Sequence, residues 1–151
     1  MTVLALDLGT KCGFALQHPT GLMISDTWTL DAKKRKESHG MRFIRFRQHL
    51  DQLHKDWNLT LIYFEEVRRH MSCDAAHAYG GYMAILLAWC AENDVEYMSV
   101  PVGEIKKAWT GRGNAKKEDM VEEARRRGYD PCDDNEADAI AILVLKTEVK
   151  S

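Results

Sequence analysis

Three carboxylates in apolar surroundings constrain this sequence more than any other feature. Asp7 interrupts the apolar segment Val3–Leu8, and Glu65 and Glu66 end the apolar run Leu61–Phe64, so that this run also presents a carboxylate. Asp138 lies among small apolar residues. An unpaired charge is costly to bury, and carboxylates brought together from three core elements would repel one another unless a cation lay between them. The sequence therefore predicts a site for a hard divalent cation such as Mg²⁺ or Mn²⁺.

A site of this kind has a characteristic chemistry. Two such ions about 4 Å apart can activate water and stabilise the leaving 3′-oxygen during in-line cleavage of a phosphodiester. The predicted reaction is metal-assisted phosphodiester hydrolysis.

The pattern of apolar residues predicts an α/β fold. Short strands at 3–6, 13–17 and 21–30 should form an antiparallel meander, and charged or amphipathic stretches then alternate with apolar runs. Asp74, Pro101 and Asn114 are the expected starts of three helices. The remaining expected elements are strands at 59–65 and 95–100 and helices at about 43–57, 74–92, 101–109, 114–127 and 137–145. We expect a mixed sheet with helices on its faces.

Length and composition limit the class of protein. The 151 residues fit one domain, 1–151. No stretch of eighteen apolar residues occurs, and no basic segment precedes Thr2–Leu8, so neither a membrane span nor a signal peptide is expected. The four cysteines form no CxxC pair, which favours reduced structural thiols and a cytoplasmic protein.

The net charge of −2 is not that of a strongly basic nucleic-acid-binding domain. The basic residues are nevertheless clustered, and local clusters can bind phosphate when acidic groups elsewhere cancel them in the total. These clusters are Lys33–Lys36, Arg68–His70, Lys106–Lys107, Arg112–Lys117 and Arg125–Arg127. We interpret the last as a solvated helix end.

Each carboxylate also has a structural interpretation. Asp7 could bond the turn amides near Gly9, and either Glu65 or Glu66 could pair with the arginines that follow. Either Asp133 or Asp134 could cap the last helix. Asp134 and Asp138, four residues apart, would share one helical face and could instead hold one metal between them.

Three acidic motifs in this order resemble those of the RuvC family of Holliday-junction resolvases. They are LALDLGT at 4–10, YFEEV at 63–67 and DDNEADAIAI at 133–142, and the basic stretch at 102–117 is also similar to the family's. The resemblance covers almost the whole chain. It implies an RNase H-like fold with a five-stranded mixed sheet, a homodimer, and paired incisions across a four-way junction with two Mg²⁺ ions, for which Mn²⁺ can substitute.

Carried over by position, the resemblance implies that Asp7, Glu65 and Asp138 are metal ligands, with Glu65 selected over Glu66. It also implies that Lys106 and Lys117 contact DNA near the scissile phosphate. Cellular members of the family carry an acidic residue or histidine where this chain has Asn135, so Asp134 or Glu136 is the candidate replacement. This departure looks more like the RuvC-like nucleases of bacteriophages, which accept a wider range of branched DNA, including three-way junctions and flaps.

Further residues are candidates for binding DNA. Arg68 and Arg69 directly follow the strand that ends in Glu65 and could bind phosphates. His77 should lie on a helix facing the site, although a lone histidine is more often structural. The complete set of predicted DNA contacts is Arg68, Arg69, Lys106, Arg112, Lys116 and Lys117.

Three other functions compete with this prediction. An actin-like ATPase shares the turn at Asp7–Lys11, but that fold needs two such domains and this chain has room for one. A catalytically silent nucleic-acid-binding module would gain nothing from carboxylates facing phosphate. A nuclease acting on RNA or an RNA–DNA hybrid is separated from a DNA nuclease by the family resemblance alone.

Overall fold

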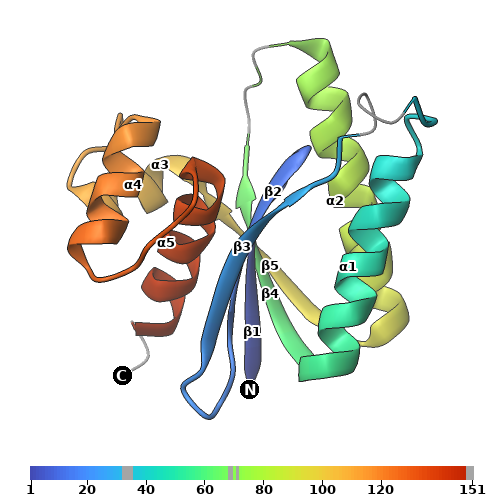
Figure 1. Ribbon diagram of the computed structural model, residues 1–151, viewed down its shortest axis with the longest axis horizontal. Coiled ribbons are helices and arrows are strands. Elements are labelled where there is room, and N and C mark those ends of the chain that lie inside the picture. The colour runs from blue at the N-terminus through green and yellow to red at the C-terminus, as the bar shows by residue number, and fades with distance from the viewer. Residues whose placement is uncertain (32–35, 68–69, 71, 149–151) are drawn as a thin grey trace.

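A computed structural model of the chain describes residues 1–31, 36–67, 70 and 72–148. Its centre is a five-stranded sheet in the order β3-β2-β1-β4-β5 (Figure 1). β1 pairs with β2 and β2 with β3 in antiparallel fashion, whereas β4 runs parallel to both β1 and β5. The strands are β1 (Thr2–Asp7), β2 (Lys11–Gln17), β3 (Met23–Thr29), β4 (Leu59–Glu66) and β5 (Glu96–Pro101). The predicted mixed α/β architecture is confirmed.

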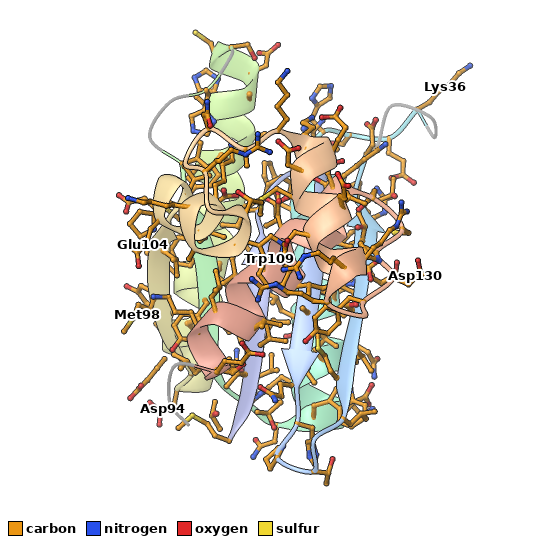
Figure 2. The ribbon with its side chains drawn as sticks, turned by 90° about the vertical axis from the view of Figure 1, so that its left-hand side faces the viewer. Lys36, Asp94, Met98, Glu104, Trp109 and Asp130 are labelled. Carbon is orange, nitrogen blue, oxygen red and sulfur yellow. The ribbon has the colours of Figure 1, made fainter. Side chains whose placement is uncertain are left out.

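Helices cover both faces of the sheet. On one side α1 and α2 lie next to each other, and on the other side lie α3, α4 and α5 (Figure 1). Figure 2 views the second group from its outer side and shows Trp109, which is only 2% exposed, among these helices. The helices are α1 (Met41–Trp57), α2 (Cys73–Asn93), α3 (Val102–Thr110), α4 (Lys117–Arg126) and α5 (Asp134–Glu148).

The sheet separates two apolar cores because successive strand residues point to opposite faces. Leu4 and Leu6 of β1 belong to the core under α1 and α2. Val3 and Ala5 belong to the core under α3, α4 and α5. Alternation along β1 and β4 therefore decides which helices each polar side chain at a strand end faces.

Two predicted helix caps are wrong, and a third helix start is displaced by one residue. Asp74 does not cap α2, because Ser72 has an extended backbone and its hydroxyl accepts the Ala75 N–H at 3.1 Å. Asn114 does not cap α4; the helix begins three residues later, where the Lys116 N–H donates to the Asp119 carboxylate at 2.9 Å. The helix predicted to open at Pro101 begins one residue later, because Pro101 ends β5 and is the N-cap of α3.

The structure also bears on the predictions about membrane spans and cysteines. Among the described residues, no helix is both long and apolar enough to span a membrane. All four cysteines are free, with Cys12 and Cys90 buried and Cys73 and Cys132 exposed.

Candidate active site

Strand register places Asp7 beside Glu65. Leu6 of β1 is paired with Phe64 of the parallel strand β4, so the next residue of each strand is a carboxylate at the same edge of the sheet. Leu6 and Phe64 both pack in the core under α1 and α2. Asp7 and Glu65 therefore face the opposite side, toward α5.

The same alternation separates Glu66 from the pair. Glu66 is the last residue of β4 and follows Glu65, so its side chain leaves the sheet on the α1 and α2 side. The structure thus places Glu65, and not Glu66, next to Asp7. This agrees with the choice that the family resemblance implied.

Helix α5 brings the third carboxylate to this edge. The backbone of Asn135 lies so close to β2 that a Cβ at Gly13 would come within 1.8 Å of the Asn135 carbonyl oxygen. Gly13 is paired with Asp7 across β1 and β2. Asp138 follows Asn135 by about one helical turn and is thereby positioned over Asp7.

The three carboxylates form one cluster. Oxygen atoms of Asp7, Glu65 and Asp138 lie within 4.8 Å of one another. Glu65 is buried, with 8% of its surface exposed, and Asp7 and Asp138 are partly buried. Ionised carboxylates this close together and this well buried repel one another, and a bound divalent cation would relieve that repulsion.

The pKa values of the three carboxyl groups reflect this mutual repulsion. Burial, followed by the negative charges of Asp138 and Glu65, raises the pKa of Asp7 well above its ordinary value. Burial, followed by Glu65 and Asp134, raises the pKa of Asp138 to about 8. Burial also raises the pKa of Glu65, an effect that a hydrogen bond with Asp7 and the charge of Lys106 oppose. Without a cation, the cluster retains protons that acidic side chains normally lose.

At the first turn of α5, Asp133 and Asp134 have different roles. The Asp133 carboxylate accepts the Glu136 N–H at 2.9 Å and the Thr27 hydroxyl at 2.7 Å, so Asp133 is the cap. Asp134 is the first residue of the helix and lies one turn before Asp138. Its charge raises the pKa of both Asp7 and Asp138, which places Asp134 at the edge of the cluster.

Glu136, the other candidate for the fourth ligand, is turned elsewhere. One of its oxygens accepts the Ser25 hydroxyl at 2.7 Å and the other accepts the Cys132 N–H at 3.0 Å. Glu136 groups with Asp26 and Cys132 rather than with Asp7. The expectation that it replaces the missing ligand is corrected, because its carboxylate joins α5 to β3.

Two lysines approach the cluster from α3 and α4. The charge of Lys106 lowers the pKa of Glu65 and Asp138, and the charge of Lys117 lowers that of Asp138. The Lys117 ammonium lies 3.9 Å from an Asp134 oxygen, and its side chain is 82% exposed. The structure therefore brings both predicted lysines to the carboxylates.

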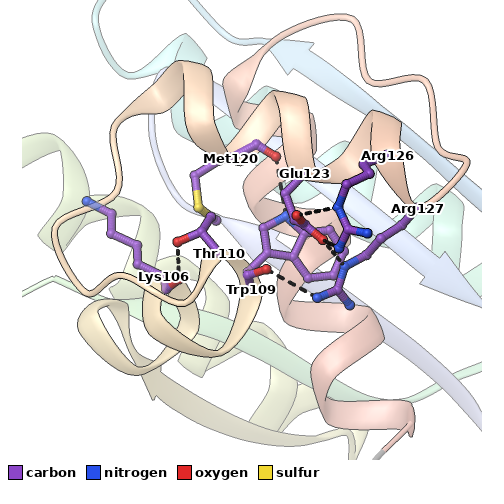
Figure 3. A network of polar contacts seen from close by, with 7 residues as sticks. All are labelled: Lys106, Trp109, Thr110, Met120, Glu123, Arg126 and Arg127. Atoms are coloured by element: carbon purple, nitrogen blue, oxygen red, sulfur yellow. Dashed lines mark hydrogen bonds and ion pairs between the residues drawn. The ribbon is translucent and has the colours of Figure 1, made fainter.

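A polar network joins α3, which carries Lys106, to α4 (Figure 3). The Trp109 indole N–H donates to the Met120 carbonyl at 3.3 Å. The Arg127 guanidinium lies 3.9 Å from the centroid of the Trp109 ring and donates to the Trp109 carbonyl at 3.2 Å. Glu123 accepts hydrogen bonds from both Arg126 and Arg127.

The remaining predicted residues are dispersed. Arg112 lies 3.2 Å from Asp119 in an ion pair at the start of α4, next to the exposed Lys116. His77 is exposed on α2 and lines a separate pocket beside Thr10. Arg68 and Arg69 lie outside the described residues.

Sequence reasoning missed Gly13. Nothing in its immediate neighbours indicates that a helix 120 residues away will lie against it. A glycine inside a strand is the one signal available, since such a glycine often marks close approach of another backbone.

Solved structures share this arrangement of strands and helices. RuvC of Thermus thermophilus is 20% identical, with 98% of this chain and 97% of that chain covered and a TM-score of 0.70. The chain has a RuvC-like fold. The T. thermophilus RuvC in complex with Holliday junction substrate matches this fold with a TM-score of 0.75 at 18% identity, covering 94% of this chain and 89% of that one.

A eukaryotic structure has the same RuvC-like fold. The yeast mitochondrial Holliday junction resolvase Ydc2 matches with a TM-score of 0.62 at 15% identity, covering 93% of this chain and 75% of that chain. Neither a protein-family model nor a curated protein sequence matches the chain. The structural matches confirm the predicted RNase H-like α/β fold.

Proposed function

We propose that this chain is a metal-dependent endonuclease that cleaves phosphodiester bonds in Holliday junctions and other branched DNA. The observation that carries the proposal is the cluster of Asp7, Glu65 and Asp138, whose oxygens lie within 4.8 Å of one another. Three carboxylates facing phosphate would lower the affinity of a surface that only binds nucleic acid. The substrate class is supported by the likeness to a RuvC structure in complex with Holliday junction substrate.

The donor set fits Mg²⁺, with Mn²⁺ as a substitute, because both ions prefer hard oxygen ligands. Asp7, Glu65 and Asp138 would hold the metal, and Asp134 is the proposed further ligand, one helical turn from Asp138. Two bound ions would activate water and stabilise the charge on the leaving 3′-oxygen.

The chain's own side chains do the positioning. β1 and β4 hold Asp7 and Glu65 side by side, and α5 holds Asp138 against them. Lys106 and Lys117 would bind the oxygens of the scissile phosphate from the α3 and α4 side, a role that their charges next to Glu65 and Asp138 support. Because the Lys117 side chain is 82% exposed, its ammonium can leave Asp134 for an incoming phosphate at little cost.

The DNA backbone would continue over the start of α4. Lys116 is exposed there, and the Arg112 side chain remains 64% exposed despite its ion pair with Asp119. Exposed cations of this kind neutralise phosphates without reading sequence. Arg68 and Arg69 stay proposed contacts on the strength of the sequence.

We also propose a homodimer formed through α2. Ala76, Gly80, Ala84 and Ala88 recur every fourth residue, and a Cβ at Gly80 would meet no atom within 4 Å. Small residues at this spacing allow two helices to approach closely, and an isologous dimer would bring the same face of α2 from both subunits together. Light scattering should find a dimer that Ala84→Glu converts to monomer, whereas Ala108→Glu on α3 should not; dimers with Ala84→Glu would exclude this face.

Residues 1–151 are proposed to form one nuclease domain of the bacteriophage type, acting in the cytoplasm of the host cell. The bacteriophage assignment rests on Asn135, which stands where the family has an acidic residue or histidine. It predicts activity on three-way junctions and flaps as well as four-way junctions.

The direct test is cleavage of a labelled four-way junction beside linear duplex, single-stranded DNA and an RNA–DNA hybrid, with Mg²⁺, Mn²⁺ or chelator. Paired nicks that require metal and are confined to branched DNA are the expected result. Cutting of the hybrid alone would make the protein an RNase H-type enzyme. Junction binding without any cutting would make it a silent binding module.

A further inference from the structure

Glu65 stands near the point where its strand stops pairing with its neighbours. The pairing of β4 with β1 ends at Phe64, one residue before Glu65. On the other side β4 pairs with β5 as far as Pro101, which lies opposite Glu66 and has no N–H to donate. Strand ends that have few ladder hydrogen bonds open readily. The backbone of Glu65 therefore needs support from outside the sheet if its carboxylate is to stay beside Asp7.

Tyr79 of α2 supplies this support. Its hydroxyl donates to the Glu65 carbonyl oxygen at 2.8 Å and accepts the Val67 N–H at 3.3 Å. One side-chain oxygen thus bridges two backbone groups on either side of the last residue of β4. Tyr79 is only 8% exposed, so water competes little for these hydrogen bonds.

Packing holds the Tyr79 hydroxyl in place. The ring belongs to the core under α1 and α2, and Val67 packs against the same core. The ring of His70 lies beside it, with 5.1 Å between the two centroids. α2 runs along the face of the sheet opposite α5 (Figure 1). The phenol oxygen is therefore a fixed point on α2 to which the end of β4 is attached.

Tyr79 acts on the backbone of Glu65 and not on its carboxylate. The carboxylates of Glu65 and Asp7 face α5, whereas Tyr79 lies in the core on the other face of the sheet. Tyr79 is accordingly neither a metal ligand nor a proton donor at the metal site. Its effect on the site must pass through the position of Glu65. Such an effect matters, because a metal site requires its ligands to be held to within about 0.5 Å.

We propose that Tyr79 is a positioning residue of the metal site, whose hydroxyl fixes the end of β4 so that Glu65 can bind the cation together with Asp7 and Asp138. Loss of the hydroxyl lowers the affinity of the site for divalent cations. The geometry of the site thereby depends on α2, a helix that contributes none of the proposed metal ligands. This inference rests on the proposed function, because it takes Glu65 as a metal ligand.

The test uses the full chain and measures Mn²⁺ binding by calorimetry. Tyr79→Phe removes one oxygen and keeps the ring in the core, and it should raise the Kd for Mn²⁺ about tenfold, as expected when a group that orients a ligand is lost. Tyr82→Phe is the matched control. Tyr82 is buried on the same helix, and its ring packs against Phe43 and Phe46 of α1. This variant should keep the wild-type Kd.

Cleavage of a four-way junction at increasing Mn²⁺ concentration separates positioning from a merely structural role. Tyr79→Phe should need about tenfold more Mn²⁺ for half-maximal cleavage and should approach the wild-type rate at saturating Mn²⁺. A loss of folded protein would instead lower the maximal rate and leave the Mn²⁺ dependence unchanged. That result, or a wild-type Kd for Mn²⁺ in Tyr79→Phe, would overturn the inference and leave the nuclease proposal standing.

Hydrogen exchange in chelator examines the bridge itself in the wild-type protein, so it does not depend on whether a variant folds. The Val67 amide should be protected, and Tyr79→Phe should remove this protection. Exchange of the wild-type Val67 amide at the rate of an exposed loop would overturn the inference alone. A wild-type protein that binds Mn²⁺ no better than Asp7→Asn would contradict the metal site and overturn both proposals.

Discussion

The carbonyl oxygen of Asn135 lies against Gly13, where an added Cβ would come within 1.8 Å of it. This contact joins the start of α5 to the middle of the sheet, opposite Asp7 in the β1–β2 register. It sets how far Asp138 stands from the other two carboxylates.

Gly13→Ala should therefore damage the site and the fold together. The methyl group would meet backbone, which cannot rotate away, and overpacking of this kind costs about 1–3 kcal/mol. We expect lower stability in urea and weaker Mn²⁺ binding by calorimetry. Gly103→Ala is the matched control: a Cβ there meets nothing within 4 Å, and alanine favours the helix. Unchanged Mn²⁺ binding by Gly13→Ala would show that this contact does not position Asp138.

The raised pKa of Asp138 predicts how stability depends on pH without metal. The folded protein keeps this proton up to about pH 8, whereas the ordinary pKa is 3.8. Between these values the folded state binds more protons, so this contribution to stability is complete at low pH and is lost as the pH rises to about 8. The free energy of unfolding should fall by up to about 1.4 kcal/mol per pH unit for this one group in chelator.

Urea titrations at pH 5, 6.5 and 8 measure this slope. Asp138→Asn should make it shallower without abolishing it, because the pKa values of Asp7 and Glu65 are also raised, and Mg²⁺ should reduce it by replacing the protons. Equal slopes for the wild-type protein and Asp138→Asn would mean that Asp138 is ionised in the fold.

Arg127→Ala should loosen α3 from α4. The variant loses the guanidinium 3.9 Å from the Trp109 ring centroid and the hydrogen bond to the Trp109 carbonyl, worth about 1 kcal/mol together. Arg126→Ala removes a surface ion pair with Glu123 and should cost less than about 0.5 kcal/mol. Thermal unfolding of both variants measures the difference. An equal loss in the two would show that the Trp109 contact adds nothing.

Lys117→Ala should slow cleavage and leave stability unchanged. The side chain is exposed, so folding should not depend on it. Its positive charge nevertheless lowers the pKa of Asp138, which shows that it acts on the carboxylate cluster. Loss of one positioned cation should lower kcat about tenfold or more. Lys107→Ala, an exposed lysine on α3, serves as the control. Full activity of Lys117→Ala would remove this lysine from the proposed site.

The sequence was sufficient for the carboxylates because a charge inside an apolar run needs a reason to be buried. Asp7 and Asp138 are each recognisable in this way from their own neighbours, whereas the choice of Glu65 over Glu66 came from the family resemblance. The alternation of strand and helix patterns likewise predicted the mixed sheet. Each of these features depends only on residues that are close in the sequence, so it can be recognised without a structure.

Features that depend on packing could not be predicted. Asp133 caps α5 because Thr27, more than a hundred residues away, also binds its carboxylate; the sequence left Asp133 and Asp134 equivalent. Glu136 was a candidate ligand until its contact with Ser25 was visible.

The most direct test compares Glu65→Gln with Glu66→Gln in cleavage of a four-way junction with Mg²⁺. The two residues are adjacent, but strand alternation places only Glu65 with Asp7 and Asp138. We expect Glu65→Gln to bind the junction and fail to cut it, because it loses a ligand charge while keeping its shape. Glu66→Gln should cut at nearly the wild-type rate. Cleavage by Glu65→Gln at the wild-type rate would contradict the proposed metal centre.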